Sequence, residues 1–318
     1  MSFPILIKNA RCVSSTGIIK QDVLLRDGKI AQLGEVNASA AEQLIDGTHL
    51  YLLPGALDPQ VHFRDPGLTH KEDLRTGSMA AASGGVTSFF DMPNTKPSTI
   101  TIEGMAERKR NAAEKCVVNY NFFIGATNTN LDALNDVENV PGIKIFMGSS
   151  TGDLLVSDTK DLDNIFGNGS RLIAVHAEDD DIINAAQEIY KNSTDFNHHQ
   201  FVRPADAALK ATTLAVELSI KYQRRLHILH LTTLDEVRYL EIQKSKAPIS
   251  AEVCPQHFLL SAPHVYQKLG AYAQMNPPIR DLQHGEALWD GLVNGVIDCI
   301  ATDHAPHTHE EKAKPFGQ

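Results

Sequence analysis

The chain has 318 residues, of which 42% are hydrophobic and 21% charged, a composition typical of a globular protein with a sizeable core. Its formal net charge is -10 and its pI is about 5.7, and it has no basic run with interleaved aromatic residues, so nucleic acid is not an expected partner. The four cysteines are widely spaced and form no CxxC pair, which favours a reducing compartment over a zinc ribbon or a disulfide scaffold.

The first residues lack the layout of a signal peptide, and no apolar run approaches the length of a membrane span. We therefore expect a cytoplasmic protein without a membrane partner. A homodimer is expected only because it is the commonest assembly of soluble proteins.

Residues 1–53 predict the first part of a small β-domain. Short apolar runs at 5–13, 22–33 and 43–46 are separated by turn signals, notably Asp27-Gly28 and Asp46-Gly47. A segment of this size buries little core by itself, so we expect it to pack on the residues that follow.

From residue 54 to 318, short apolar strands alternate with helical stretches. The predicted strands are 56–64, 86–92, 117–125, 142–147, 172–176, 225–231, 249–254 and 296–303. The predicted helices are 71–83, 101–115, 180–190, 204–222, 233–245 and 285–294. This is the layout of an α/β protein of the (β/α)₈ TIM-barrel type. A doubly wound open sheet is the alternative, and the lack of a GxGxxG after an early strand argues against it.

Polar side chains collect where these strands end, which is the end that forms the active site in such a barrel. They are Gln60, His62 and Arg64 (placed on one face by strand alternation), Asp91, Asn94, Lys144, His176, His230 and Asp303. One histidine on an apolar strand is usually a core residue. Three histidines and an aspartate at the same end of one barrel form a ligand set for Zn²⁺ or a similar ion.

Lys144 lies between Ile143 and Ile145 in a predicted buried strand. Burial of an ammonium group is costly, so the pKa of Lys144 should fall and leave a nucleophilic amine. Such an amine can form a Schiff base or capture CO₂ as a carbamate that bridges two metals. The simpler alternative is a lysine that reaches solvent from the end of the strand. His198 and His199, in a polar stretch, are interpreted as solvated or near the rim of the site.

Nine short motifs, in this order, resemble the cyclic-amidase branch of the amidohydrolase superfamily, and most closely the bacterial dihydroorotases. They are Val61-His-Phe-Arg-Asp-Pro-Gly-Leu-Thr-His70, Gly84-Gly-Val-Thr-Ser88, Asp91-Met-Pro-Asn-Thr95, Gly142-Ile-Lys-Ile-Phe-Met147, Val175-His-Ala-Glu-Asp179, Ile228-Leu-His-Leu-Thr232, Cys254-Pro-Gln-His257, Asn276-Pro-Pro-Ile-Arg280 and Thr302-Asp-His-Ala-Pro-His307. The resemblance covers nearly the whole chain. It implies a distorted (β/α)₈ barrel with a small β-domain made from both chain ends.

The resemblance also implies a role for each matched position. His62, His176, His230 and Asp303 would be ligands of one or two Zn²⁺ ions, and Lys144 would be N-carboxylated and bridge two metals. Arg64, Asn94 and His307 would hold the carboxylate of dihydroorotate, and Asn276 would line the substrate ring. Asp303 would also be the catalytic proton carrier.

The implied reaction is the reversible hydrolysis of the cyclic amide of dihydroorotate to N-carbamoyl-aspartate in pyrimidine biosynthesis. A hydantoinase or allantoinase would use the same chemistry on another ring. Arg64 and Met92-Pro-Asn-Thr95 argue against these, because they suit a substrate with a carboxylate. A Schiff-base aldolase acting through Lys144 would leave the histidines and Asp303 without a role.

The chain departs from the family pattern at Gln60, where the family normally carries the first histidine of His-x-His. An amide oxygen is a poorer, neutral ligand for Zn²⁺. Gln60 could still ligate, the site could hold one metal, or the chain could be an inactive subunit that assembles with aspartate transcarbamoylase. We expect an active enzyme, because the other positions match. The family also continues beyond the last predicted strand, so the carboxyl-terminal part of the barrel unit is expected to be truncated here.

Overall fold

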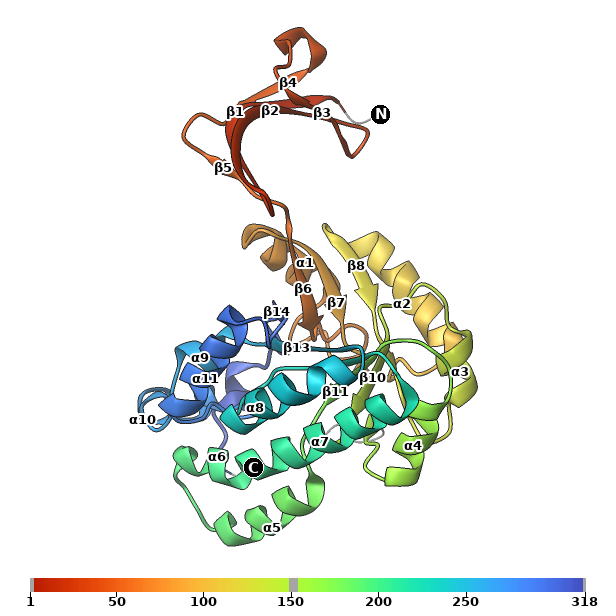
Figure 1. Ribbon diagram of the computed structural model, residues 1–318, viewed down its shortest axis with the longest axis vertical. Coiled ribbons are helices and arrows are strands. Elements are labelled where there is room, and N and C mark those ends of the chain that lie inside the picture. Colours follow the sequence, from red (N-terminus) through yellow and green to blue (C-terminus); the bar gives the residue numbers. More distant parts are fainter. Residues whose placement is uncertain (1–2, 149–153, 317–318) are drawn as a thin grey trace. The chain divides into compact units, whose positions relative to one another are not determined.

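The computed structural model describes residues 3–148 and 154–316, and it divides into two units, Met1–Ala56 and Leu57–Gln318. The first unit is a β-sheet with strand order β3-β2-β1-β4, in which β5 also pairs with β1 (Figure 1). Its strands are β1 (Ile5–Ser14), β2 (Gly17–Arg26), β3 (Lys29–Gly34), β4 (Gln43–Asp46) and β5 (Tyr51–Leu52).

The predicted run 22–33 forms a hairpin, because its turn residues reverse the chain. Arg26 pairs with Lys29, and the two residues between them, Asp27 and Gly28, have φ values of 52° and 72°. An Asp-Gly pair with positive φ is the signature of a tight two-residue turn. The β1–β2 and β2–β3 pairs are antiparallel, whereas β4 and β5 pair with β1 in parallel.

The second unit contains a closed parallel barrel. Its strand segments are β6 (Ala56–Val61), β7 (Val86–Asp91), β8 (Asn119–Phe122), β9 (Ile124–Gly125), β10 (Ile143–Phe146), β11 (Ile173–His176), β12 (Leu226–Ile228), β13 (Ile249–Val253) and β14 (Cys299–Ile300). The order β6-β7-β8 continues through β9 into β10-β11-β12-β13-β14, with Phe123 alone separating β8 from β9. The barrel closes where Val61 bridges His304 and the His62 N–H donates to the His304 carbonyl at 2.7 Å. The predicted (β/α)₈ barrel is confirmed.

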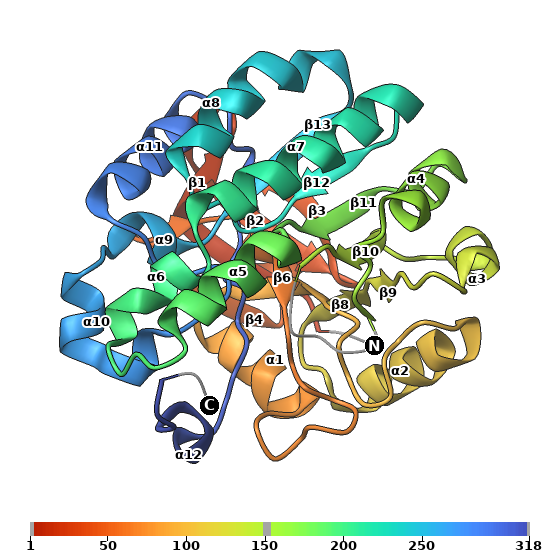
Figure 2. The same cartoon turned by 90° about the horizontal axis from the view of Figure 1, so that it is seen from below.

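Helices surround these strands (Figure 2). They are α1 (Leu74–Ser83), α2 (Ile102–Lys115), α3 (Leu131–Asp136), α4 (Thr159–Gly167), α5 (Asp180–Tyr190), α6 (His199–Val202), α7 (Ala205–Tyr222), α8 (Leu234–Gln243), α9 (Pro255–Leu259), α10 (His264–Leu269), α11 (Leu282–Val293) and α12 (His309–Lys312). The six predicted helices are confirmed, with ends that differ by a few residues. Helix α4 was not among the predicted elements, and neither were the short helices α3, α6, α9, α10 and α12. Asp158 caps α4, and its buried residues Leu162, Ile165 and Phe166 have helical spacing.

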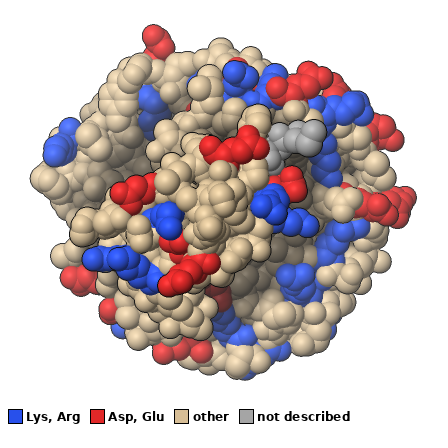
Figure 3. All heavy atoms as spheres, turned by 90° about the horizontal axis from the view of Figure 1, so that it is seen from above, with Lys and Arg blue, Asp and Glu red and all other residues tan. Residues whose placement is uncertain are grey.

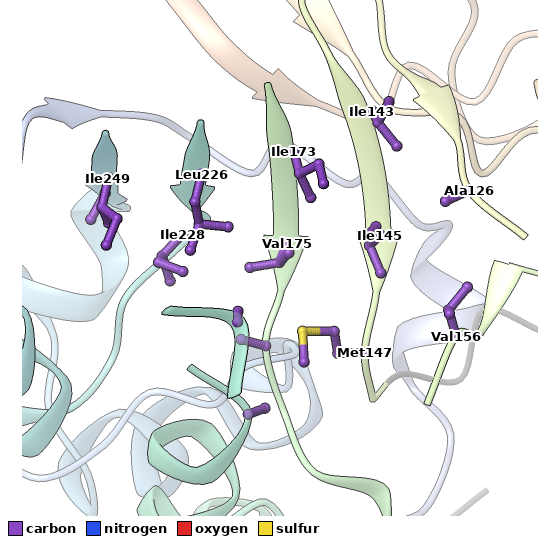
Figure 4. Close-up of a cluster of buried hydrophobic side chains, with 14 of the residues drawn as sticks. Ala126, Ile143, Ile145, Met147, Val156, Ile173, Val175, Leu226, Ile228 and Ile249 are labelled. Atoms are coloured by element: carbon purple, nitrogen blue, oxygen red, sulfur yellow. The ribbon is translucent and has the colours of Figure 1, made fainter. Parts of the chain in front are cut away.

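Strand alternation divides the barrel side chains into two sets. Aliphatic side chains of β10–β13, such as Ile143, Ile145 and Val175, belong to the core shared with the surrounding helices (Figure 4). The alternate positions form a register row across four strands, Lys144, Ala174, His227 and Ser250. Because successive side chains point to opposite faces, this row points into the barrel.

A buried ion pair joins the end of β7 to α2. The Arg108 guanidinium donates to Asp91 Oδ2 at 2.7 Å and to the Met92 carbonyl at 2.8 Å, while Asp91 Oδ1 accepts from the Phe63 N–H at 3.1 Å. Asp91 was predicted as one of the polar residues at the strand ends. Its contact with Arg108 instead helps to pack α2 against the barrel.

The surface carries charges of both signs. On the face shown in Figure 3, Lys and Arg side chains are interspersed with Asp and Glu over a larger uncharged area. Across residues 3–148 and 154–316, no helix combines the length and the apolar character needed to span a bilayer. All four cysteines are free thiols.

Replacing Arg108 by methionine should lower the free energy of unfolding by about 3–5 kcal/mol, because Asp91 would remain buried without its cation. Chemical denaturation followed by circular dichroism measures this. Arg110→Met, an exposed change on the same helix, is the matched control and should cost less than about 0.5 kcal/mol. Equal stability of the Arg108→Met and control variants would contradict the role given to this pair.

Candidate active site

A cavity of about 660 Å³ lies at the carboxyl ends of the barrel strands. Every site residue predicted from the sequence lines it: Gln60, His62, Arg64, Asn94, Lys144, His176, His230, Asn276, Asp303 and His307. They come from segments up to 247 positions apart (60 to 307), and the barrel brings them together because parallel strands end at one rim.

Three of these residues lie where the backbone leaves its strand in a left-handed conformation. Arg64, His230 and Asp303 have φ values of 54°, 35° and 51°, a region that non-glycine residues rarely adopt. We predicted that strand 56–64 places Arg64 on the same face as Gln60 and His62 by alternation. This is wrong, because β6 ends at Val61. Arg64 reaches the cavity through this turn, and its Nε donates to the Pro306 carbonyl at 3.0 Å.

His176 and His230 form a close pair of ring nitrogens. His176 Nδ1 lies 3.0 Å from His230 Nε2, and His176 Nε2 lies 2.8 Å from Glu178 Oε2. Glu178 is fully buried and is also held by Arg203. Because a carboxylate only accepts, His176 donates through Nε2 and presents the lone pair of Nδ1 to His230. Burial lowers the pKa of both histidines, which keeps the rings neutral.

Lys144 is 1% exposed, and its Nζ has no hydrogen-bond partner among the residues that the structure describes. Burial lowers its pKa to about 7, as its aliphatic neighbours predict. Its nearest described aromatic contact is the Phe146 ring, whose centroid lies 4.3 Å from Nζ. A buried amine that is partly uncharged at neutral pH and has no partner is open to carboxylation or to metal ligation.

His62 and Gln60 converge on Asp303. His62 Nε2 and Gln60 Nε2 each lie 3.0 Å from Asp303 Oδ1, and His62 Nδ1 lies 2.6 Å from Asn94 Oδ1. Burial alone would raise the pKa of Asp303. The hydrogen bond from His62 and the nearby positive charges outweigh burial, and hold that pKa well below its usual range. Asp303 is therefore an ionised carboxylate at the base of the cavity.

Arg64 presents a buried cation to the cavity. It is 7% exposed, and its Nη2 lies 3.2 Å from His307 Nε2. Burial together with the charges of Arg64 and Lys71 lowers the pKa of His307 to about 4, so His307 faces Arg64 as a neutral ring. Among the residues that the structure describes, no carboxylate lies within 4.0 Å of the Arg64 guanidinium. This arrangement suits an anionic group on a ligand.

Two site features are missed by sequence reasoning. His199 lines the cavity, where its Nε2 lies 2.9 Å from the Met275 carbonyl and 3.1 Å from Asn276 Oδ1. Of the two interpretations of His199, solvated or near the rim of the site, the second fits its place in the cavity lining, where burial lowers its pKa to about 4. The second missed feature is Glu178, which supports His176. Its position two residues after His176 is the sequence signal that could have revealed this role.

A further cluster lies on the inner face of the barrel. His227, Glu252 and Cys299 have donor atoms within 4.8 Å of one another, and in the described part of the chain no other His, Cys, Asp and Glu side chains group so closely in threes. His227 is already bonded on both ring nitrogens, to Ser250 Oγ at 2.8 Å and to Glu252 Oε2 at 3.0 Å. The cluster is therefore satisfied internally, and Glu252 Oε1 also accepts from the His230 N–H at 3.4 Å.

Comparisons with known proteins show the family of this chain. Residues 51–160 match the amidohydrolase family. A dihydroorotase from Methanosarcina acetivorans is 35% identical over 96% of this chain and 68% of its own length. An allantoinase from Salmonella paratyphi B is 30% identical over 98% of this chain and 72% of its own length. The L-hydantoinase structure from Arthrobacter aurescens superposes with a TM-score of 0.91 at 29% identity, covering 98% of this chain and 71% of that one. The chain belongs to the amidohydrolase family, in the branch of cyclic amidohydrolases that includes these relatives.

Proposed function

We propose that this cyclic amidohydrolase is a zinc-dependent dihydroorotase, which interconverts dihydroorotate and N-carbamoyl-aspartate in pyrimidine biosynthesis. The observation that supports this substrate is Arg64. Its buried guanidinium lies next to His307, lines the same cavity as Asn94 and has no carboxylate within 4.0 Å among the described residues, which suits a ring that carries a carboxylate. Hydantoin and dihydrouracil have no such group and would leave the cation unpaired.

The residues of the cavity fit a divalent ion. His176 Nδ1 and His230 Nε2 are 3.0 Å apart, a separation that two ligands of one Zn²⁺ can have when each Zn–N distance is about 2.0–2.1 Å. The contact of His176 with Glu178 supplies the carboxylate support that metal-bound histidines usually have. Lys144, as the amine or as its carbamate, would add a third donor. A bound ion would supply Lewis-acid activation of water and of the ring carbonyl.

The other steps fall to side chains of the chain itself. Arg64, Asn94 and His307 would orient the ring through its carboxylate, and Asn276 would line the ring. Asp303 would take the proton from the attacking water and deliver it to the departing ring nitrogen, since it is ionised and faces the cavity.

Gln60 supports one other candidate, an inactive subunit that assembles with aspartate transcarbamoylase. A homodimer in the cytoplasm is proposed with the enzyme, and the free thiols of all four cysteines support a reducing compartment. Turnover separates the two candidates. A zinc-loaded protein that hydrolyses dihydroorotate is the enzyme, whereas one that only co-purifies with a transcarbamoylase is the subunit.

On a panel of dihydroorotate, dihydrouracil, hydantoin and allantoin, the highest kcat/KM is expected for dihydroorotate. Replacing Arg64 by lysine should lower that value about 10- to 100-fold, because a charge-assisted contact worth about 1.5–3 kcal/mol loses its fork geometry. The matched control is Arg75→Lys, an exposed change on α1, which should leave kcat/KM unchanged. Wild-type kinetics in Arg64→Lys would remove the argument for a carboxylated substrate.

Replacing Asp303 by asparagine should lower kcat about 100- to 10,000-fold, because the amide cannot accept and return a proton. Steady-state assays measure the loss, and circular dichroism verifies that the protein stays folded. Asp290→Asn, at an exposed position of α11, is the control with the same chemical change. Retention of most activity by Asp303→Asn would assign the proton transfer to another group.

Replacing Glu178 by glutamine should weaken Zn²⁺ binding about 10- to 100-fold, since His176 loses its charged hydrogen-bond partner. Competition with a chromophoric chelator measures the affinity directly. Glu188→Gln, an exposed carboxylate on α5, should bind Zn²⁺ like the parent protein. Unchanged affinity in Glu178→Gln would place the metal away from His176.

A further inference from the structure

The backbone on either side of Asn276 is held by two histidines. His199 Nε2 lies 2.9 Å from the Met275 carbonyl. His257 Nε2 lies 3.2 Å from the Pro277 carbonyl. Because a carbonyl oxygen only accepts, each ring donates its Nε2–H to the backbone. The position of Asn276 at the cavity wall is therefore fixed from both neighbouring residues.

His199 also reaches the side chain of Asn276, with its Nε2 3.1 Å from Asn276 Oδ1. The Met275 carbonyl requires a proton on this nitrogen, and burial lowers the pKa of His199 to about 4, so the neutral ring carries its one proton there. The reversed carboxamide would place its NH₂ group against the ring N–H, which is repulsive. Asn276 therefore turns Oδ1 toward His199 and turns the NH₂ group away from it.

The carboxamide of Asn276 is exposed where it lines the cavity. Among residues 3–148 and 154–316, its hydrogen-bond partner is His199 alone. Ordering a rotatable side chain when a ligand binds costs affinity, and a contact that orders it beforehand removes that cost. The NH₂ group is thus a donor held ready for a ligand atom that accepts.

The fold fixes His199 relative to this loop. His199 begins α6, and the carbonyl of Arg203, just after this helix, accepts from Arg280 Nη1 at 2.8 Å. Arg280 Nε also donates to Thr232 Oγ1 at 3.1 Å. The segments that carry His199 and Asn276 are therefore joined at two places, so the contact between the two side chains does not depend on a single mobile side chain.

We propose that His199 is a positioning residue, which orients the Asn276 carboxamide so that its NH₂ group donates to a carbonyl oxygen of the substrate ring. The inference rests on the proposed function, because it assumes a cyclic amide in this cavity. Among the described residues, Asn276 has no hydrogen bond to a group proposed for the hydrolytic step. Its donor therefore serves the binding of the ring, and the contact is made equally before and during bond cleavage.

The test compares two replacements of equal length in the metal-loaded full chain. His199→Met fills the space without a donor, whereas the NH₂ group of His199→Gln can take the place of the ring N–H. His199→Met should raise KM for dihydroorotate about 5- to 20-fold and leave kcat nearly unchanged, because it removes uniform binding of the ring. His199→Gln should retain most of the affinity. His264→Met, at an exposed position of α10, is the matched control and should not change KM.

A double-mutant cycle separates action through Asn276 from a general effect on the structure. Asn276→Ala should raise KM about as much as His199→Met, and the double variant should raise it no further, because the second change removes a contact that is already lost. Additive effects would overturn the inference. Equal KM values in His199→Met and His199→Gln would also overturn it, as would lower stability to denaturant with an unchanged KM.

The position of the proton on His199 can be measured without a ligand. In protein labelled with nitrogen-15 at histidine, the NMR shifts of His199 at neutral pH should be those of a neutral ring with its proton on Nε2. The signal is assigned by its loss in His199→Gln. A proton on Nδ1 would overturn the inference.

Failure of this inference is distinguishable from failure of the proposed function. If another ring of the substrate panel gives a higher kcat/KM than dihydroorotate, the proposed substrate is wrong, and the cycle is measured on that ring, since each of them carries a carbonyl. Additive effects in a parent protein that prefers dihydroorotate refute only the role of His199. A parent protein that neither turns over nor binds any ring of the panel refutes both.

Discussion

The burial of both faces of the barrel strands is the constraint on which the rest of this structure depends. Helices cover one face, so Ile145 and Val175 point outward into an aliphatic core. The other face fills the barrel interior, where Lys144 and Glu252 are removed from bulk water. Such groups are costly unless they are paired or bind a ligand. Glu252 is paired with His227, whereas Lys144 Nζ has no partner in the described part of the chain and lines the cavity.

Two buried guanidinium groups each bind a buried carboxylate, but the two ion pairs have different roles. Arg108 holds Asp91 and thereby fixes α2 to the end of β7. Arg203 holds Glu178, which in turn orients the His176 ring toward His230. Each pair satisfies a carboxylate that burial alone would neutralise. The two carboxylates differ in their other hydrogen-bond partner. Asp91 accepts from the backbone N–H of Phe63, whereas Glu178 accepts from the His176 ring.

The side chains of the cavity form two contacting groups. His176 contacts His230, and Gln60 and His62 contact Asp303, each at 3.0 Å. Arg64 adds a buried positive charge to the lining of the cavity. Family membership places this chain among the cyclic amidohydrolases.

The sequence by itself determined the alternation of strands and helices, and the polar positions that follow the strands, because periodicity and turn chemistry are local. It therefore predicted the barrel and eight of the residues that line the cavity, whereas Asn276 and His307 were predicted from the resemblance to a family. Only the tertiary structure decided their partners. Asp91 belongs to Arg108, His199 faces the cavity, and Arg64, His230 and Asp303 turn through left-handed backbone as their strands end. These contacts join residues far apart in the chain, and their energies depend on burial, which no local pattern encodes.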